Sequence, residues 1–189
     1  MKKALVPLAP GFEEIEAITV IDILRRAGVE VTVAGTVPGP IEASRKTRHL
    51  PDCLLNDVRA EDFDIVILPG GQPGTTNLRN DPRVRQILQT FHTNGRHIAA
   101  ICAAPTVLAA CGVLQGRIAT CHPGSRAELA AGAGTVSDQR VVEDGPIITS
   151  QSAGTAMEFA FKLVDILCGP EKAAEVNKGV FAPISVSLC

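Results

Sequence analysis

The chain has 189 residues, of which 46% are hydrophobic and 20% charged, so it has the size of one domain whose core needs neither disulfides nor a structural metal. Its 18 basic and 20 acidic residues give a formal net charge of −2. The absence of a long basic run and of any Trp or Tyr argues against nucleic-acid binding. No export signal or membrane-spanning stretch is recognisable. We therefore expect a single soluble, cytoplasmic domain over residues 1–189.

Short apolar runs alternate with amphipathic segments, which is the pattern of parallel strands covered by helices on both faces. The strand candidates are ALVPLA (4–9), VEVTVAG (29–35), DIVILPGG (64–71), HIAAICA (97–103) and PIITS (146–150). The helix candidates are the segments 14–27, 82–94, 103–111 and 153–168. The sequence thus predicts an α/β fold with a mostly parallel sheet.

Two segments are less regular. Residues 36–51 are rich in Pro and basic side chains and predict an irregular excursion or a small hairpin. Residues 120–145 are broken by several glycines, and RVVED (140–144) is typical of a short hairpin strand.

Carboxylates crowd the start of the first predicted helix, at Glu13, Glu14 and Glu16. Negative charge there complements the helix dipole, which explains two of the three. The apolar period does not determine whether Glu16 faces solvent or the edge of the sheet.

Cys102 stands where an apolar strand runs directly into a small-residue helix. Such a strand-to-helix turn exposes the side chain at its tip, and the positive end of the helix dipole is expected to lower the pKa of the thiol. The small neighbours Ala103 and Ala104 leave room for a substrate. The alternative is a buried structural cysteine.

The remaining cysteines lie far apart, without a C-x-x-C pair, so we expect reduced thiols and no zinc site. They are Cys53, Cys111, Cys121, Cys168 and Cys189.

Gly70 and Gly71 follow the third predicted strand and are candidates for turning backbone N–H groups toward an oxyanion. No G-K-[ST] follows, so this is not a phosphate-binding loop. The alternative is an ordinary tight turn.

The motifs LAPGFEEIEA, ILPGG and AAICAAP occur in this order on the predicted elements. They resemble the ThiJ/PfpI superfamily, in the branch of the parkinsonism-associated protein deglycase and bacterial YajL. The likeness continues through TSQSAGTAMEFA to the C-terminal segment. It implies a flavodoxin-like three-layer α/β/α sandwich of the class I glutamine amidotransferase type, usually a homodimer, with no cofactor and no metal.

The resemblance also implies the roles of individual residues. The nucleophile matches Cys102, and the acid that shares a proton with it matches Glu16. The active-site histidine matches His122. The backbone amide donors to the substrate oxygen match Gly71 and Ala103.

An arginine that reaches the partner's site in the dimer matches Arg45, with Arg26 beside it. Solvated surface charge is the alternative for both. Ala103 stands where the protease-like branch carries His, so a peptidase dyad is not expected. The segment 152–155 reads Ser-Ala-Gly-Thr where many relatives have Gly-Pro-Gly-Thr, which we expect to reshape one wall of the pocket. Cys53 and Cys121 have no assigned counterpart.

Resemblance to glyoxalase III and deglycase relatives implies an enzyme that converts methylglyoxal, glyoxal or their adducts to hydroxy acids. In this hypothesis the Cys102 thiolate attacks an aldehyde carbon, and Glu16 and His122 move protons. The alternative is a redox-sensing stress chaperone in which Cys102 is oxidised to sulfinic acid. A glutamine amidotransferase would need a Cys-His-Glu triad, but no downstream H-x-E occurs.

Overall fold

The computed structural model describes residues 1–183. The strands of the main sheet are β1 (Lys3–Leu8), β2 (Glu30–Gly35), β5 (Cys53–Leu54), β6 (Ile65–Leu68), β7 (His97–Ile101), β10 (Val141–Asp144) and β11 (Ile147–Ser150). The helices are α1 (Glu14–Arg26), α2 (Gly74–Asn80), α3 (Pro82–Thr93), α4 (Pro105–Ala110), α5 (Arg126–Ala130), α6 (Ala156–Cys168) and α7 (Pro170–Val180). Short ladders join β3 (Ile41–Glu42) to β4 (Arg48–His49) and β8 (Ile118–Ala119) to β9 (Thr135–Val136).

The main sheet has seven strands in the order β10-β11-β7-β6-β1-β2-β5. Only β10 is antiparallel to its neighbour, and the other pairs are parallel. The run β2-β1-β6-β7-β11 has the strand order of flavodoxin-like folds, in which ligands bind at the carboxyl ends of the strands.

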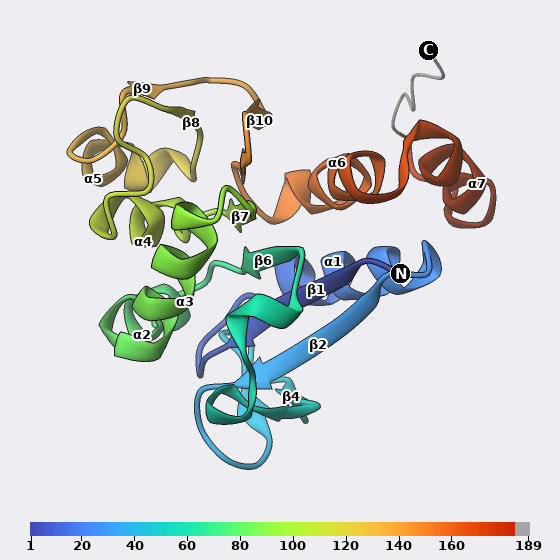
Figure 1. The fold of residues 1–189 in the computed structure, drawn as a ribbon, viewed down its shortest axis with the longest axis horizontal. Coiled ribbons are helices and arrows are strands. Elements are labelled where there is room, and N and C mark those ends of the chain that lie inside the picture. The colour runs from blue at the N-terminus through green and yellow to red at the C-terminus, as the bar shows by residue number, and fades with distance from the viewer. Residues whose placement is uncertain (184–189) are drawn as a thin grey trace.

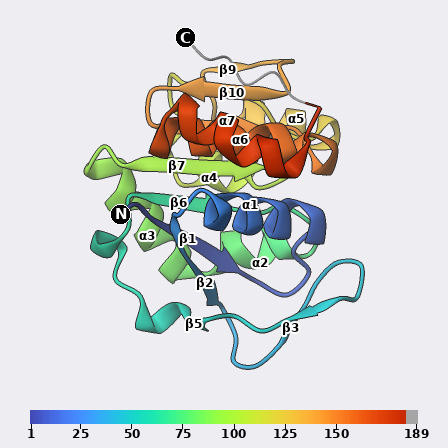
Figure 2. The ribbon, with the colours of Figure 1, turned by 90° about the vertical axis from the view of Figure 1, so that its right-hand side faces the viewer.

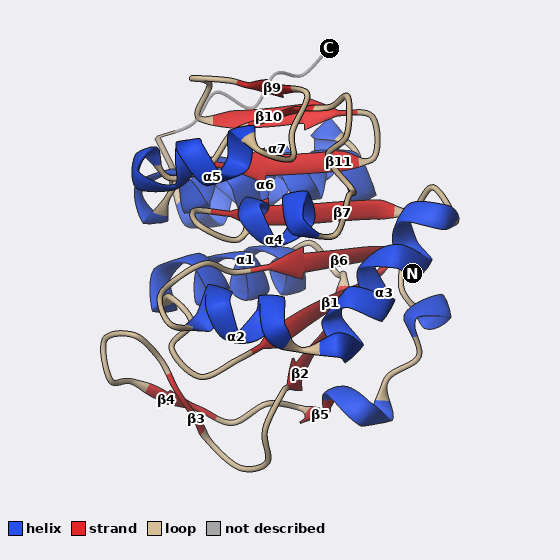
Figure 3. Cartoon of the chain, turned by 90° about the vertical axis from the view of Figure 1, so that its left-hand side faces the viewer, coloured by secondary structure: helices blue, strands red, loops and turns tan. Residues whose placement is uncertain are grey.

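Helices cover both faces of this sheet. Helices α1, α6 and α7 lie on one face, and α2, α3, α4 and α5 lie on the other (Figure 1). Figure 2 views the molecule from the α1, α6 and α7 side, and Figure 3 from the opposite side. The predicted three-layer α/β/α sandwich with a mostly parallel sheet is confirmed. No helix within residues 1–183 is long and apolar enough to cross a membrane.

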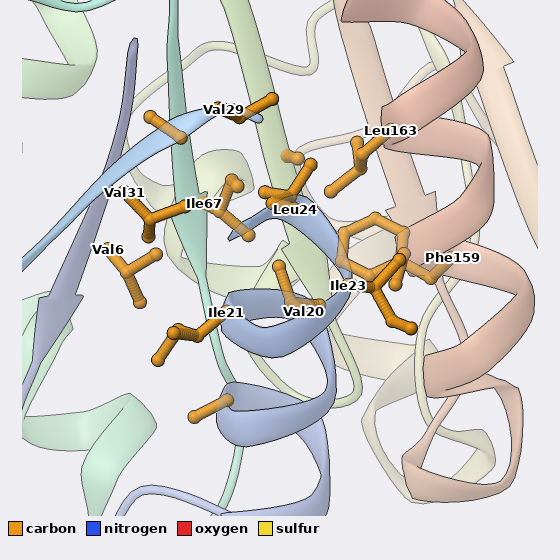
Figure 4. Packing of buried hydrophobic residues seen from close by; sticks show 14 of the residues in the cluster. Val6, Val20, Ile21, Ile23, Leu24, Val29, Val31, Ile67, Phe159 and Leu163 are labelled. Carbon is orange, nitrogen blue, oxygen red and sulfur yellow. The ribbon is translucent and has the colours of Figure 1, made fainter. Parts of the chain in front are cut away.

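Each face of the sheet has its own buried apolar cluster. On one face, Val20 and Leu24 of α1 pack among Val6 of β1 and Phe159 and Leu163 of α6 (Figure 4). Burying side chains of this size stabilises the fold by roughly 1.5–3 kcal/mol each. This packing fixes α1 on the sheet and thereby places the acidic start of the helix at the end of β1.

The periodic segments are found where the sequence predicts them. Helices α1, α3 and α6 confirm the predictions at 14–27, 82–94 and 153–168, although a turn of 3-10 helix, Ala153–Thr155, precedes α6. The segments 36–51 and 140–144 each contribute to an antiparallel hairpin, β3–β4 and β10–β11.

Other elements differ from the prediction. The helix predicted over 103–111 begins only at Pro105, because the residues before it form turns closed by i→i+3 hydrogen bonds, from the Ala104 N–H to the Ile101 carbonyl and from the Thr106 N–H to the Ala103 carbonyl. Proline is favoured at the first helical position, which fits this later start. Helices α2 and α5 are not predicted, because segments of 7 and 5 residues are too short to show an apolar period.

Candidate active site

The candidate site lies where β1, β6 and β7 end at the same edge of the sheet. Gly70 and Gly71 follow β6, Cys102 follows β7, and α1 begins shortly after β1. Because the three strands are parallel neighbours, their carboxyl ends bring these segments together.

Cys102 occupies a strained turn between β7 and α4. Its φ of 66° is unusual for a residue other than glycine. Such a conformation costs about 1–3 kcal/mol and persists only where the surrounding structure enforces it. The Cys102 N–H donates to the carbonyl of Ser150 over 2.9 Å, and its carbonyl accepts from the N–H of His122 over 2.8 Å. The Ala104 N–H closes the turn on the Ile101 carbonyl at 3.0 Å. The side chain therefore projects from a turn fixed on both sides.

Glu16 faces the interior beside Cys102, which settles the orientation that the apolar period left open. The residue is 1% exposed. The Gly70 N–H donates to Oε2 of Glu16 over 2.9 Å. A Cβ added to Gly70 would lie 2.7 Å from both that oxygen and the Cβ of Cys102, so the carboxyl and the cysteine meet across a glycine that has no room for a side chain. Within residues 1–183, Oε1 of Glu16 has no hydrogen-bond partner that meets normal geometry.

The environment raises the pKa of both groups. Burial raises the pKa of Glu16 to about 7, against the lowering effect of its interaction with the Cys102 thiol. Burial and then the charge of Glu16 raise the pKa of Cys102 to about 12, while the backbone amides of Ala103 and Gly71 act in the opposite direction. The predicted lowering of the thiol pKa is thus wrong. Helix α4 begins only at Pro105 and has 6 residues, so its dipole is weak at Cys102.

The two groups titrate as a pair. Burial disfavours the charged form of both, and the charge of Glu16 opposes ionisation of Cys102, so the raised pKa values belong to the pair and not to either residue alone. The geometry places the Glu16 carboxyl where it can exchange a proton with the Cys102 thiol. A carboxylate with a pKa near 7 is well matched to that task at neutral pH.

Backbone amides from two loops oppose the rise of the Cys102 pKa. The N–H groups of Gly71 and Ala103 both interact with Cys102. Gly71 has a φ of 90°, and a Cβ there would lie 2.4 Å from the backbone N of Glu13, so only glycine is accommodated. Gly70 differs from its predicted role, because its N–H donates to Glu16. It therefore positions the acid and does not contribute to an oxyanion hole.

His122 is brought to the site by its main chain. Its N–H donates to the Cys102 carbonyl, whereas its exposed ring accepts from the Gly124 N–H through Nδ1 at 3.1 Å. A neutral ring that accepts at Nδ1 carries its proton on Nε2. Among the described residues, the His122 ring makes no hydrogen bond to Cys102 or Glu16.

Arg26 and Arg45 lie away from Cys102 within this chain. Arg26 pairs with Asp22 over 2.8 Å on the exposed side of α1. Arg45 lies in the turn between β3 and β4, where its backbone N–H donates to Glu14 over 2.8 Å. Among the described residues, no hydrogen bond or ion pair joins either guanidinium to Cys102 or Glu16.

Sequence reasoning missed the contribution of Ser150, the last residue of β11. The Ser150 carbonyl fixes the Cys102 turn, and the Ser150 hydroxyl lies 2.6 Å from the hydroxyl of Thr155. Ser152 and Thr155 form a capping box. The Ser-x-x-Thr spacing is a recognisable sign of such a cap, but a backbone carbonyl leaves no mark in a sequence.

Nothing in residues 1–183 resembles a metal centre, since no group of three His, Cys, Asp or Glu is placed to hold an ion. Cys53, Cys102, Cys111, Cys121 and Cys168 are free thiols, and Cys189 lies outside the described residues.

The fold and the site together define an α/β sandwich protein with a cysteine and a carboxylic acid paired at the ends of its parallel strands. The sequence profile of the DJ-1/PfpI family matches residues 2–166, and the chain belongs to this family. Protein dj-1beta of Drosophila melanogaster is 47% identical over 180 residues, covering 95% of this chain and 96% of the relative. The crystal structure of Drosophila melanogaster DJ-1beta superposes with a TM-score of 0.93 at 46% identity, covering 97% of this chain and 99% of that chain. The glutathione-independent glyoxalase DJR-1.2 of Caenorhabditis elegans is 42% identical over 178 residues, covering 94% of this chain and 95% of the relative.

Proposed function

We propose that this protein is a cofactor-independent glyoxalase III or deglycase-type enzyme that converts methylglyoxal, glyoxal or their adducts to hydroxy acids. The observation that carries the proposal is the Cys102–Glu16 pair, in which a buried thiol lies beside a carboxyl whose pKa is near neutrality. The relative that bears the name of a glutathione-independent glyoxalase supports the same activity.

The first step is addition of sulfur to the aldehyde carbon of methylglyoxal. The Cys102 thiol forms the C–S bond while its proton passes to Glu16, and the aldehyde oxygen becomes an oxyanion. The amides of Gly71 and Ala103, which interact with Cys102, are placed to stabilise that charge. Protonation of this oxygen gives a hemithioacetal.

The second step is an internal redox isomerisation. A base removes the proton from the former aldehyde carbon to give an enediol, and reprotonation at the neighbouring carbon gives a thioester of lactate. No external electron acceptor is needed, because one carbon is oxidised and its neighbour reduced. Water then hydrolyses the thioester and releases lactate and the free thiol. Glu16 and His122 are the proton carriers in this proposal.

Turnover of methylglyoxal without glutathione tests the proposal. We expect wild type to form many equivalents of lactate, and Cys102→Ser and Glu16→Gln to lose this activity. Cys111→Ser removes another partly buried free thiol away from the pair and is the matched control. Absence of lactate from folded wild type would refute the enzyme proposal.

A redox sensor is the second candidate, favoured by the same carboxyl. A Glu16 that keeps its proton near neutral pH can donate a hydrogen bond to an oxidised Cys102 sulfur. In this proposal peroxide converts Cys102 to sulfinic acid stoichiometrically, without dicarbonyl turnover. Mass spectrometry after mild peroxide treatment distinguishes it, because selective oxidation at Cys102 in a protein that forms no lactate supports the sensor.

A homodimer is part of the proposed function. Ile15 and Ile18 of α1 are 55% and 38% exposed, and they line a groove together with Arg26 and Met157. A second copy on this face would cover these apolar side chains. Light scattering of wild type and Ile18→Asp is the test, and we expect a dimer for the first and a monomer for the second.

A further inference from the structure

The strained turn at Cys102 is held by main-chain contacts, and the next residue, Ala103, is held by both the main chain and a side chain. The Ala103 carbonyl accepts from the Thr106 N–H over 3.1 Å. The hydroxyl of Thr106 donates to the carbonyl of Ala103 over 2.7 Å. Thr106 is 2% exposed, so water does not compete for this hydrogen bond. The contact ties the peptide that follows the turn to the first helical residues of α4.

An arginine from another helix completes this contact. Nη2 of Arg79, in the last turn of α2, donates to the hydroxyl oxygen of Thr106 over 2.6 Å. Because a hydroxyl has a single proton, an arginine that donates to Thr106 leaves that proton for the Ala103 carbonyl. The direction of both hydrogen bonds is thereby fixed.

The same guanidinium reaches a third helix. Nη1 of Arg79 forms an ion pair with Glu128 of α5. Helix α2 follows Gly71, α4 follows Cys102, and α5 follows His122, and all three helices lie on the same face of the sheet (Figure 3). Arg79 of α2 thus contacts both α4 and α5, the helices that follow Cys102 and His122.

We propose that Arg79 and Thr106 are positioning residues, which act through the Ala103 carbonyl to keep the turn at Cys102 in its reactive geometry. This inference rests on the proposed function, which it deepens by assigning the parts that hold the nucleophile. The side chains lie behind the turn and take no part in proton transfer. Without them the Ala103 carbonyl keeps only the hydrogen bond from the Thr106 N–H, so the peptide between Ala103 and Ala104, and with it the start of α4, is held less firmly beside Cys102.

The fork shape of the guanidinium is essential to this role. Two separate nitrogens of Arg79 serve Thr106 and Glu128, which a lysine ammonium cannot reproduce with the same geometry. Nε of Arg79 is buried without a hydrogen-bond partner among the described residues. Burying an unsatisfied donor is unfavourable, so part of the stabilisation from the two contacts of Arg79 is offset.

Alkylation of Cys102 by iodoacetamide is the test, because it reports on the thiol without requiring dicarbonyl turnover. The rate is measured from about pH 6 to about pH 10 by mass spectrometry of the Cys102 peptide. We expect Thr106→Val to lower the rate about tenfold at neutral pH, the effect of losing one hydrogen bond. Thr106→Ser keeps the hydroxyl and is expected to stay within about twofold of wild type.

The arginine variants test the second step of the contact. Arg79→Gln and Arg79→Lys are both expected to lower the rate by about threefold or more, because neither side chain joins Thr106 to Glu128 as a fork. Thr90→Val and Arg85→Gln are matched controls on α3, away from the turn. Thermal unfolding confirms that each variant is folded. If Thr106→Val does not fold, the alkylation rates of the two arginine variants are the test.

The outcomes separate this inference from the proposed function. The role of the hydroxyl would be overturned if folded Thr106→Val were alkylated at the wild-type rate, or if Thr106→Ser were slowed as much as Thr106→Val. The role of the forked guanidinium would be overturned if Cys102 in Arg79→Lys were alkylated at the wild-type rate. A wild type that forms no lactate would refute the enzyme proposal and leave this test unchanged. Where lactate is formed, we expect Thr106→Val to lower kcat with little change in KM.

Discussion

Replacing Glu16 with Gln should change how stability depends on pH, since the wild-type carboxyl is held in an environment that favours its neutral form. The pKa of Glu16 is about 7 in the folded protein, against 4.5 for an ordinary solvent-exposed glutamate. The folded state therefore binds this proton more tightly than the unfolded state. The proton on Glu16 therefore stabilises the fold at low pH, and the free energy of unfolding falls as the pH rises from 4.5 through 7.

The size of the effect follows from the shift. A difference of one pKa unit corresponds to about 1.4 kcal/mol, so ionisation of Glu16 lowers the free energy of unfolding by roughly 1 kcal/mol at pH 5 and by roughly 3 kcal/mol at pH 8. Glu16→Gln cannot ionise, and its amide still offers an oxygen to the Gly70 N–H. We expect the stability of the variant relative to wild type to rise by roughly 2 kcal/mol between pH 5 and pH 8.

Urea unfolding of both proteins across this range measures the difference. Glu14→Gln is the control, because hydrogen bonds from Arg45 and Thr47 contribute to a lowered pKa of Glu14. A carboxyl with a lowered pKa is already ionised in both states above pH 5, so this variant should differ from wild type by a constant amount. A constant difference for Glu16→Gln as well would show that Glu16 ionises normally and would refute the shared-proton argument.

Three further predictions follow from the packing and charge of the site. The kcat/KM for methylglyoxal should rise as the pH increases through about 7, where Glu16 becomes able to accept the thiol proton, and a profile flat from pH 5 to pH 9 would exclude Glu16 as the base. Gly70→Ala places a methyl group 2.7 Å from the Cβ of Cys102 and from Glu16, so activity should fall by about 100-fold. Gly95→Ala, after α3, has open space but a φ of 62° that strains an alanine, so it should lose some stability and retain activity. Phe159→Ala empties a fully buried position between α6 and α1 and should lower the free energy of unfolding by about 3–5 kcal/mol; a loss below about 1 kcal/mol would contradict the packing described.

The fold was largely accessible from the sequence, because apolar period and helix caps are local properties. The stripe of α1 and the strand after it determine how the helix lies on β1 and β2. The orientation of Glu16 was not accessible in this way. It depends on where the helix begins, and that point is fixed by the Glu13 side chain accepting from the Glu16 N–H over 2.9 Å.

The chemistry of the site was less predictable than its location. The direction of the Cys102 pKa shift depends on burial and on a carboxyl from a distant segment, neither of which a local pattern reports. The role of Gly70 depends on the direction in which one peptide N–H points. The contact between Arg79 and Thr106 joins residues 27 positions apart, with no motif connecting them.

The distance along the chain between the partners of the site has a consequence for damaged or newly made protein. Gly70 and Glu16 are 54 positions apart, so the pair exists only once the sheet has assembled. In an unfolded chain Cys102 is an ordinary thiol whose pKa lies below the value of about 12 that it has in the fold. Unfolding therefore produces a more acidic thiol with no carboxyl to direct it. Folding therefore lowers the fraction of Cys102 that is thiolate at a given pH, because burial and the charge of Glu16 disfavour the charged sulfur.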